Sequence, residues 1–127
     1  MLTFPNAKIN IGLNIVERRS DGYHNIESVF YPIQWQDGLE MIKADTFDFR
    51  TTGLAIPGET DNNLIIKALG LLKEATGIDV FKSIVHLHKV IPMGAGMGGG
   101  SADGAFALKL ANDLFALNLS NDDLKAL

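Results

Sequence analysis

The segment IPMGAGMGGGSADGA, residues 91–105, gathers residues that can bind an anion. It holds six glycines, three alanines, one serine and no lysine. Glycine has no Cβ, so consecutive backbone N–H groups can curl around one negatively charged ligand. A helix that begins within or just after such a segment adds its unpaired N–H groups and the positive end of its dipole. The segment therefore predicts a cradle for phosphates, above all those of a nucleotide. The alternative is a glycine-rich connector that binds nothing.

The spacing of the glycines separates this segment from three known nucleotide loops. Residues 94–99, GAGMGG, match G-x-G-x-x-G, but a dinucleotide-binding fold carries that motif in its first βαβ unit with an acidic residue about 20 positions later at a strand end. Here the acid at that distance, Asp113, falls in a predicted helix. A Walker loop ends in Lys-Ser or Lys-Thr, which this segment lacks. The protein-kinase glycine loop precedes a lysine-bearing strand, whereas this segment leads into a helix.

Lys8 is a second candidate for chemistry on phosphates. It lies, with Asn10, on the polar side of a strand predicted over residues 7–15. Its charge can stabilise negative charge that develops on a transferred phosphoryl group and can lower the pKa of a nearby alcohol. The alternative is an ordinary solvated lysine. The apolar side of the same strand is expected to form a buried face, with the members Ala7, Ile9, Ile11, Leu13 and Ile15.

Two pairs of residues beside turns or on strands can also bind ligands. Tyr23 and His24 follow the Asp21-Gly22 turn signal; the tyrosine ring can stack on a pyrimidine and the histidine can hydrogen-bond to its edge. They can equally be turn-flanking residues that pack on the sheet. His86 and His88 face the same side of a strand as metal ligands can, but no third ligand is evident nearby, so surface or packing roles are favoured.

The elements that must position these residues form an α+β pattern, with helices covering one face of a sheet. Strand patterns span residues 7–15, 25–33, 39–44, 47–51 and 80–91. A first helix is predicted to begin at Asp61 or Asn62 and to end at Gly77, with the apolar stripe Leu64, Ile65, Ala68, Leu69, Leu72 and Ala75. A second helix is predicted from Ser101, with Ala105, Leu108, Ala111 or Asn112, and Phe115 along one side. A short third helix is predicted with Ser120 as its cap and Asp123 completing a capping box.

Composition excludes several classes of protein. The 127 residues suffice for one domain with a hydrophobic core. There is no cysteine, which excludes disulfides and thiolate metal sites. The net charge is −4 and the 11 Lys and Arg residues are scattered, which argues against a nucleic-acid surface. No apolar run approaches the ~18 residues of a membrane span, and the first ten residues lack a secretory signal. We therefore expect a cytoplasmic protein.

Three motifs resemble one known family. The pattern Pro-x-x-x-Gly-x-Gly-Gly-Gly-Ser-Ala at Pro92–Ala102 resembles the phosphate loop of the GHMP kinases, the superfamily of galactokinase, homoserine kinase and mevalonate kinase. Residues 7–33 and DNNLIIKA at 61–68 are similar to the first strands and the first helix of one branch. That branch phosphorylates the 2-hydroxyl of a cytidine-diphosphate-linked methylerythritol in the non-mevalonate route to isoprenoids. The resemblance covers nearly the whole chain.

The resemblance implies a role for each matching residue. Lys8 and Asn10 match residues beside the reacting hydroxyl, and Tyr23 and His24 match the pair that holds the cytosine ring. Asn63, Leu64 and Lys89 match positions near the adenine and ribose of ATP. The residues implied to wrap the ATP phosphates are Pro92, Met93, Gly94, Ala95, Gly96, Met97, Gly98, Gly99, Gly100, Ser101 and Ala102. Mg²⁺ is expected to accompany the nucleotide, without a metal site of the protein's own. The family fold also implies a left-handed βαβ crossover, against the usual rule.

One part of the family pattern has no match. The catalytic aspartate of the family lies in a Gly-x-Asp stretch well downstream of the glycine loop, and only 25 residues follow Ala102. Asp103 is assigned to the loop, and the later aspartates to helices. We therefore expect residues 1–127 to be the N-terminal ATP-binding domain of a two-domain kinase, inactive without its C-terminal domain and the general base beyond Leu127. The alternatives are a non-catalytic nucleotide-binding module and a GHMP kinase for another small alcohol.

Overall fold

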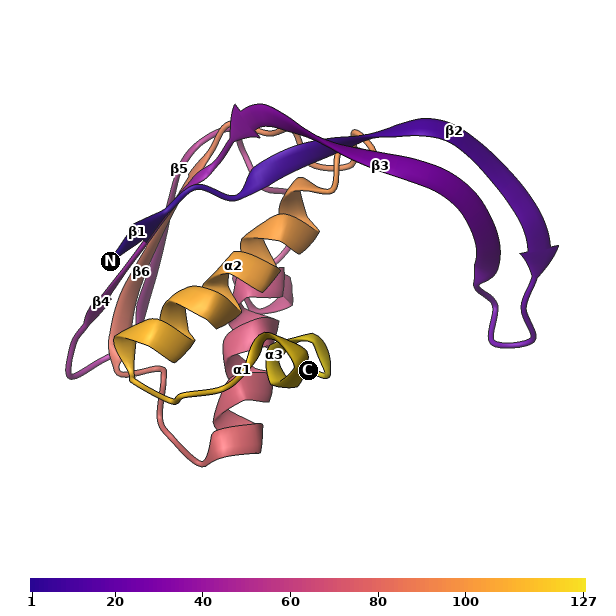
Figure 1. Ribbon diagram of the computed structural model, residues 1–127. Helices are drawn as coiled ribbons and strands as arrows, with labels where there is room; N and C mark the ends of the chain where they lie inside the picture. The colour runs from indigo at the N-terminus through magenta and orange to yellow at the C-terminus, as the bar shows by residue number, and fades with distance from the viewer.

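The computed structural model describes residues 1–127 as an α+β domain with a long β-arm (Figure 1). This confirms the predicted fold class. No helix is long and apolar enough to cross a membrane. The elements in chain order are β1 (Leu2–Thr3), β2 (Asn6–Arg18), β3 (His24–Gln36), β4 (Gly38–Lys43), β5 (Asp48–Gly53), the 3₁₀ turn η1 (Thr60–Asn62), α1 (Leu64–Thr76), β6 (Ser83–Lys89), α2 (Gly99–Leu114) and α3 (Asn121–Lys125).

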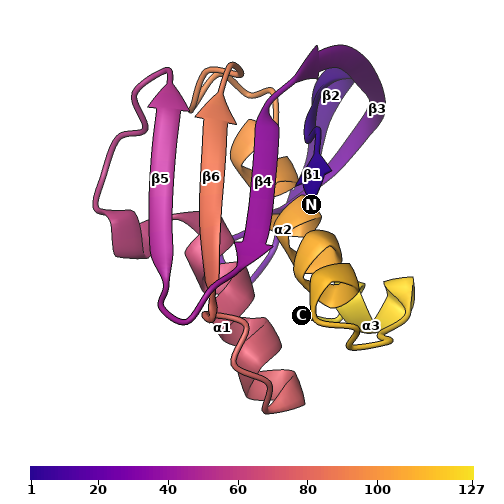
Figure 2. The ribbon, with the colours of Figure 1, turned by 90° about the vertical axis from the view of Figure 1, so that its left-hand side faces the viewer.

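The body of the domain is a four-stranded mixed sheet in the order β1-β4-β6-β5. β6 pairs antiparallel with β4 and parallel with β5. In Figure 2 the sheet faces the viewer. β5 and β6 both point up, β6 lies to the right of β5, and α1 lies behind them. A chain that rises through β5, returns through α1 behind the sheet and rises again through β6 makes a left-handed crossover. The crossover that the family resemblance implied is therefore present.

The core lies between this sheet and the helices. Its twelve buried members are Leu39, Met41, Ile65, Leu69, Leu72, Val80, Val85, Leu87, Ala107, Leu110, Ala111 and Leu124. The alternating burial of β4 and β6 places one side of each strand in this core. The predicted stripe of α1 is buried at its four middle positions, while Leu64 and Ala75 are exposed.

The structure corrects two predicted helix starts and confirms two other predictions about helix ends. α1 begins at Leu64 rather than Asp61 or Asn62, because the Asn63 side chain accepts the Ile65 N–H at 2.9 Å and thereby caps the helix. It ends at Gly77 as predicted, with φ of 71°. α2 begins at Gly99, two residues before Ser101. The capping box of Ser120 and Asp123 is present in α3.

The buried side of α2 also differs from the prediction. Ala105 is exposed, and Leu108 and Phe115 are only half-buried. The buried residues are Gly99, Asp103, Gly104, Ala107, Leu110 and Ala111. Apolar spacing could not find this side, because it contains an aspartate and a glycine. Gly104 lies where a Cβ would come within 3.4 Å of the Leu64 carbonyl oxygen, so a small residue lets α2 approach α1.

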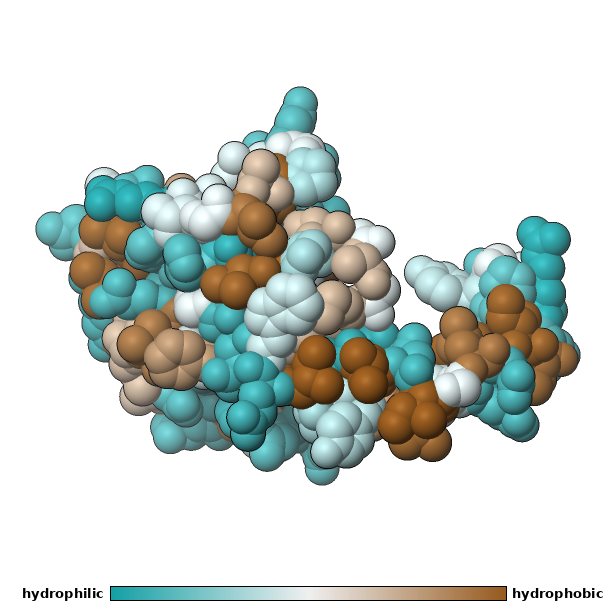
Figure 3. All heavy atoms as spheres, turned by 90° about the horizontal axis from the view of Figure 1, so that it is seen from above, coloured by the Kyte–Doolittle hydropathy of each residue, from teal (hydrophilic) through white to brown (hydrophobic).

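The predicted buried face of β2 is wrong over most of its length. Ala7 is buried, but Ile9, Ile11, Leu13 and Ile15 are 41–65% exposed. The reason is that β2 pairs only with β3, and this hairpin leaves the body as an arm that no other element covers (Figure 1). Seen from above, hydrophobic side chains run along the arm in the open (Figure 3).

Two glycines give a prediction about the stability of the body. A Cβ on Gly53, at φ of +83°, would lie 2.2 Å from the Lys89 carbonyl oxygen, whereas a Cβ on Gly70 in α1 meets nothing within 4 Å. Gly53→Ala is expected to lower the free energy of unfolding by ~2 kcal/mol or more, because backbone atoms must move. Gly70→Ala, the control, is expected to raise it by ~1 kcal/mol. Urea denaturation measures both, and equal effects of the two variants would contradict this packing.

Candidate functional site

The glycine segment connects β6 to α2 as residues 90–98, and α2 begins inside the glycine run. Gly94, Gly96 and Gly98 have φ values of 69–74°, a region that favours glycine. Gly98 is the N-cap of α2, and no side chain caps the helix there. Because the first N–H groups of a helix lack intrahelical acceptors, those of Gly99, Gly100 and Ser101 are available to an external anion. The loop thus has the backbone geometry that its sequence predicted.

Lys8 lies directly against this loop. Its backbone N–H donates to the Met97 carbonyl at 2.9 Å. Its Nζ donates to the Gly96 carbonyl at 3.1 Å and to Asn10 Oδ1 at 2.9 Å, and it lies 5.0 Å from the centre of the Phe30 ring. The structure therefore brings together Lys8, Asn10 and the glycine loop, which the resemblance implies around the reacting hydroxyl and the ATP phosphates. Phe30, which reasoning from sequence missed, supports the ammonium through a cation–π contact.

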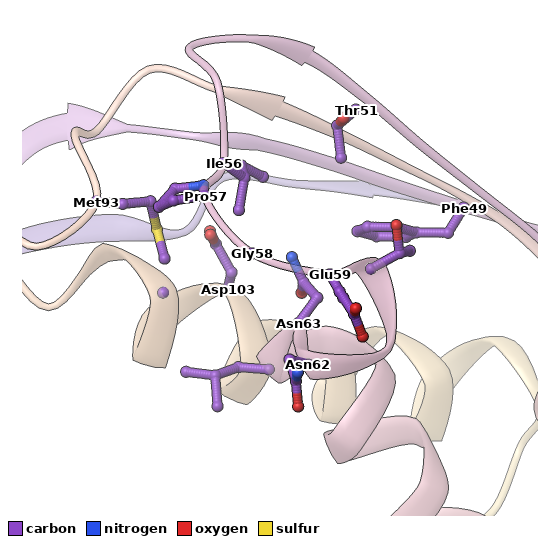
Figure 4. A pocket seen from close by; sticks show the side chains of 13 residues that line it. Phe49, Thr51, Ile56, Pro57, Gly58, Glu59, Asn62, Asn63, Met93 and Asp103 are labelled. Carbon is purple, nitrogen blue, oxygen red and sulfur yellow. The ribbon is translucent and has the colours of Figure 1, made fainter.

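Three hollows lie side by side around the loop. The Asn63 hollow is formed by Phe49 and Thr51 of β5, residues 56–60, residues 62–64, Met93, and Gly100 and Asp103 of α2 (Figure 4). The loop hollow is formed by residues 92–101 and Leu64. The Lys8 hollow is formed by Asn6, Lys8, Phe30, Gly96, Gly98, Ser101 and Ala102.

The hollows follow one another through the residues that they share. Leu64, Met93 and Gly100 border both the Asn63 hollow and the loop hollow. Gly96, Gly98 and Ser101 border both the loop hollow and the Lys8 hollow. An elongated ligand can therefore extend from Asn63, over the amides at the start of α2, to the Lys8 ammonium.

Lys89, which the resemblance implies near the adenine and ribose of ATP, lies beside the start of α2. Its side chain is fully buried, and its Nζ donates to Asp37 Oδ2 at 2.5 Å and to Asp103 Oδ2 at 2.7 Å. No part of the side chain is left at the surface for an adenine or a ribose. Asp103, assigned to the loop from sequence, lies in the first turns of α2 and is equally buried. We call Asp37, Lys89 and Asp103 the buried cluster.

The two carboxylates of the buried cluster differ in their surroundings. Burial alone would raise the pKa of Asp37, but hydrogen bonds from Lys89, Ile91 and Val90 outweigh burial and hold the pKa below its usual value. Burial raises the pKa of Asp103 to about 7, because the single hydrogen bond from Lys89 does not compensate for it. Asp103 Oδ1 has no hydrogen-bond partner. Asp37 is therefore the stable counter-ion of Lys89, and Asp103 is the group that titrates near neutral pH.

The raised pKa of Asp103 predicts a pH dependence of stability. Between pH ~4 and ~7 the folded protein holds a proton on Asp103 that the unfolded chain has lost, so stability falls as pH rises through this range. Relative to Asp103→Asn, which cannot titrate, the wild type is expected to lose on the order of a few kcal/mol of unfolding free energy from pH 4 to pH 7 and to level off above pH 8. Asp37 contributes outside this window, since its lowered pKa matters only below its usual value of 3.8. Urea titrations at pH 5, 6, 7 and 8 measure the difference, and parallel curves for the two proteins would contradict the assignment.

Two bulges decide which residues of the arm share a face. The pairing of β2 with β3 shifts by one residue between Ile11 and Leu13 and again between Ile15 and Glu17. Each shift moves the following β2 side chains to the opposite face. Lys8 and Asn10 consequently share a face with Arg18 and His24, because their partners Pro32, Phe30 and His24 are all even-numbered positions of β3. Gly12, with φ of +67°, forms the bulge between Ile11 and Leu13.

Tyr23 and His24 nevertheless lie far from Lys8. They stand at the tip of the arm, and Tyr23 is 73% exposed. Ten residues of strand, roughly 33 Å of extended chain, separate Lys8 from Arg18, the partner of His24. The structure thus places His24 on the Lys8 face of the arm but brings neither residue to the glycine loop (Figure 1).

The two strand histidines are held by a neighbouring hydroxyl. Thr52 Oγ1 lies 2.8 Å from His86 Nε2 and 2.9 Å from His88 Nδ1. No group of three or more His, Cys, Asp or Glu side chains is arranged to hold a metal ion. The hydrogen bonds to Thr52 fit the surface role favoured from the sequence.

Comparison with known proteins decides the family. The sequence profile described as the GHMP kinases N terminal domain matches residues 63–127, just over half of the chain, and includes the glycine loop and both helices beside it. The chain belongs to the GHMP kinase family. A solved GHMP kinase, described as a crystal structure of 4-(cytidine 5'-diphospho)-2C-methyl-D-erythritol kinase, superposes with a TM-score of 0.78 at 32% identity over 99% of this chain and 45% of that chain.

Sequence relatives point to the same branch of the GHMP kinases. A protein of Parabacteroides distasonis is 51% identical over 100% of this chain, and one of Cytophaga hutchinsonii is 52% identical over 98%. Both are named 4-diphosphocytidyl-2-C-methyl-D-erythritol kinase. The chain spans 46% of the length of each. A homoserine kinase of Cytophaga hutchinsonii, at 20% identity and a TM-score of 0.62, shares the fold.

Proposed function

We propose that the full-length protein is an ATP-dependent kinase that phosphorylates the 2-hydroxyl of 4-diphosphocytidyl-2-C-methyl-D-erythritol in the methylerythritol phosphate route. The observation that carries the proposal is the contact of Lys8 with the glycine loop at the start of α2. It puts a lysine beside the amides that are suited to phosphates. The relatives with 51% and 52% identity carry the name of this kinase.

ATP is proposed to lie along the three hollows. Its adenosine would occupy the Asn63 hollow, its triphosphate would accept hydrogen bonds from the amides at the start of α2, and its γ-phosphate would point to Lys8. Mg²⁺ is proposed to arrive with the nucleotide, held mainly by phosphate oxygens. Ser101 borders both the loop hollow and the Lys8 hollow and is the side-chain hydroxyl placed to assist there.

In the proposed reaction the acceptor oxygen bonds to the γ-phosphorus, and the bond from that phosphorus to the β,γ-bridging oxygen breaks, which releases ADP. Lys8 would neutralise charge on the transferred group, and Asn10 would orient the acceptor beside it. The hydroxyl proton would pass to an aspartate that the family pattern places beyond Leu127. For that reason residues 1–127 alone are proposed to be inactive.

A C-terminal domain of the same protein is the partner that we propose for the arm. The arm exposes large apolar residues on both faces, among them Ile11 at 55%, Ile15 at 65% and Val29 at 62%. Apolar surface of this extent is typical of an interface, and the relatives are about twice as long as this chain. Tyr23 and His24 are proposed to contact the cytosine, which requires the tip of the arm to come closer to Lys8 than it does here.

A coupled assay of the full-length protein tests the proposed function. With 4-diphosphocytidyl-2-C-methyl-D-erythritol and MgATP, ADP release is expected to depend on the acceptor, and homoserine or mevalonate is expected to give none above background. Turnover with one of those alcohols but not with the cytidine compound would favour a GHMP kinase of another branch. ATP binding without turnover of any acceptor would favour the nucleotide-binding module.

A further inference from the structure

The buried cluster lies between the two ends of the glycine loop. Asp37 Oδ1 accepts the N–H groups of Val90 and Ile91, at 2.5 and 2.8 Å, and these are the first residues after β6. Lys89, the last residue of β6, bonds through Nζ to Asp103 in the first turns of α2. One network of three side chains therefore fixes both the start of the loop and the helix that receives its end.

The contact between the cluster and the start of α2 is close. A Cβ on Gly99 would lie 3.1 Å from Lys89 Nζ and 2.8 Å from Ile91 Cγ2. The first residue of α2, one of those whose amide can reach a phosphate, thus sits directly over the Lys89 ammonium. A shift of either end of the loop would change the direction of these amides.

Stability alone does not account for the cluster. A buried ion pair is often no more stabilising than apolar residues of the same volume, because three polar groups must lose their water. The surrounding core is built from such residues. Apolar residues could not hold the loop in this way, because an apolar side chain accepts no hydrogen bond. A carboxylate such as that of Asp37 can accept two loop N–H groups at once.

We propose that Asp37, Lys89 and Asp103 position the glycine loop, so that the amides at the start of α2 are already directed at the phosphates before the nucleotide binds. This inference rests on the proposed function, because it assumes that the loop binds ATP. It replaces a direct nucleotide contact of Lys89 with an indirect role, in which Lys89 acts through the backbone of the loop.

Variants of Asp103 in the full-length protein test the inference, with ATP and adenosine as ligands. Asp103→Ala removes the bond between Lys89 and α2, and the Kd for ATP is expected to rise on the order of tenfold. Asp103 also borders the Asn63 hollow, so the Kd for adenosine is expected to rise as well, but by less than the Kd for ATP, because adenosine has no phosphate for the redirected amides to lose. Asp103→Asn keeps an oxygen for Lys89 and is expected to stay within about threefold for both ligands.

Ser83→Ala is the matched control. Ser83 is a buried polar residue at the opposite end of β6, where its hydroxyl donates to the Val80 carbonyl at 2.8 Å. Its loss is expected to lower the melting temperature without changing either Kd. Circular dichroism establishes that each variant is folded before binding is measured.

If Asp103→Ala does not fold, Asp37→Asn tests the other end of the loop. A carboxamide has one oxygen and cannot serve both Lys89 and the two loop amides, so affinity for ATP but not for adenosine is expected to fall. A folded Asp103→Ala or Asp37→Asn variant that binds ATP as tightly as the wild type would overturn the inference, as would equal losses for ATP and adenosine in these two variants. A wild-type protein that binds no ATP would instead contradict the proposed function.

Discussion

Replacing Lys8 with methionine is expected to lower kcat of the full-length kinase by on the order of 10²–10³-fold. Methionine keeps the apolar stem that lies beside Phe30 but removes the only ammonium in the Lys8 hollow. Charge on the transferred phosphoryl group then lacks its counter-charge, and electrostatic stabilisation of this kind is a large part of phosphoryl-transfer catalysis. The Kd for ATP is expected to change by less than about tenfold, because one exposed hydrogen bond, to Gly96, is lost from the loop.

Steady-state kinetics together with ATP binding measure this separation. Lys109→Met is the control, since Lys109 is an exposed lysine of α2 with no ion pair, and it is expected to leave both kcat and Kd unchanged. A Lys8→Met enzyme with wild-type kcat would show that Lys8 has no part in the reaction. A loss confined to the Kd for ATP would give Lys8 a role in binding only.

Gly98→Val is expected to weaken ATP binding by about 10- to 100-fold, the value of one lost hydrogen bond to a charged group. Gly98 caps α2 at φ of +69°, and a Cβ there would lie 3.0 Å from Lys8 Cε. A β-branched residue is strained in this conformation and would push the Lys8 side chain aside. The strain would redirect the amides at the start of α2, and the displacement would move the Lys8 ammonium away from the proposed phosphate site.

Gly77→Val separates this effect from plain strain. Gly77 has nearly the same backbone conformation, with φ of +71°, but a Cβ there meets nothing within 4 Å and the residue lies at the far end of α1. Both variants are expected to lose ~1–3 kcal/mol of unfolding free energy, while only Gly98→Val loses ATP affinity. Isothermal titration calorimetry decides, and an equal loss of affinity in Gly77→Val would argue that strain alone is responsible.

The sequence predicted the glycine loop and its neighbours because the signals there are local. Glycine spacing, the strand before it and the helix after it are adjacent in the chain, and Lys8 could be placed on a polar face by simple alternation. The helix start was misplaced by two residues because glycine opposes helix in propensity, while the structure places Gly99 and Gly100 in the first turn of α2.

The buried cluster could not be found in this way. Asp37 lies 52 residues from Lys89 in the chain, and its Asp-Gly dipeptide is typical of a turn. Asp103 occupies a core position of α2 that apolar periodicity assigns to other residues. The only local hint was that Lys89 lies on the same side of a predicted strand as the apolar residues Leu87 and Ile91.

For the arm, in contrast, the sequence predicted burial that the structure does not show. Alternation from Ala7 to Ile15 predicted one buried face, but the bulge at Gly12 breaks the alternation and the arm leaves the sheet. A single glycine in a strand is a weak signal of a bulge, and burial depends on what covers the strand. Sequence alone could therefore place Lys8 and Asn10 correctly and still misjudge the apolar residues between them and His24.

A crystal structure of the full-length protein with a non-hydrolysable ATP analogue tests the central claim most directly. We expect phosphate oxygens within hydrogen-bond distance of the Gly99, Gly100 and Ser101 amides, with the γ-phosphate nearest to Lys8 Nζ. A triphosphate bound elsewhere, with those amides bonded only to their own chain, would contradict it.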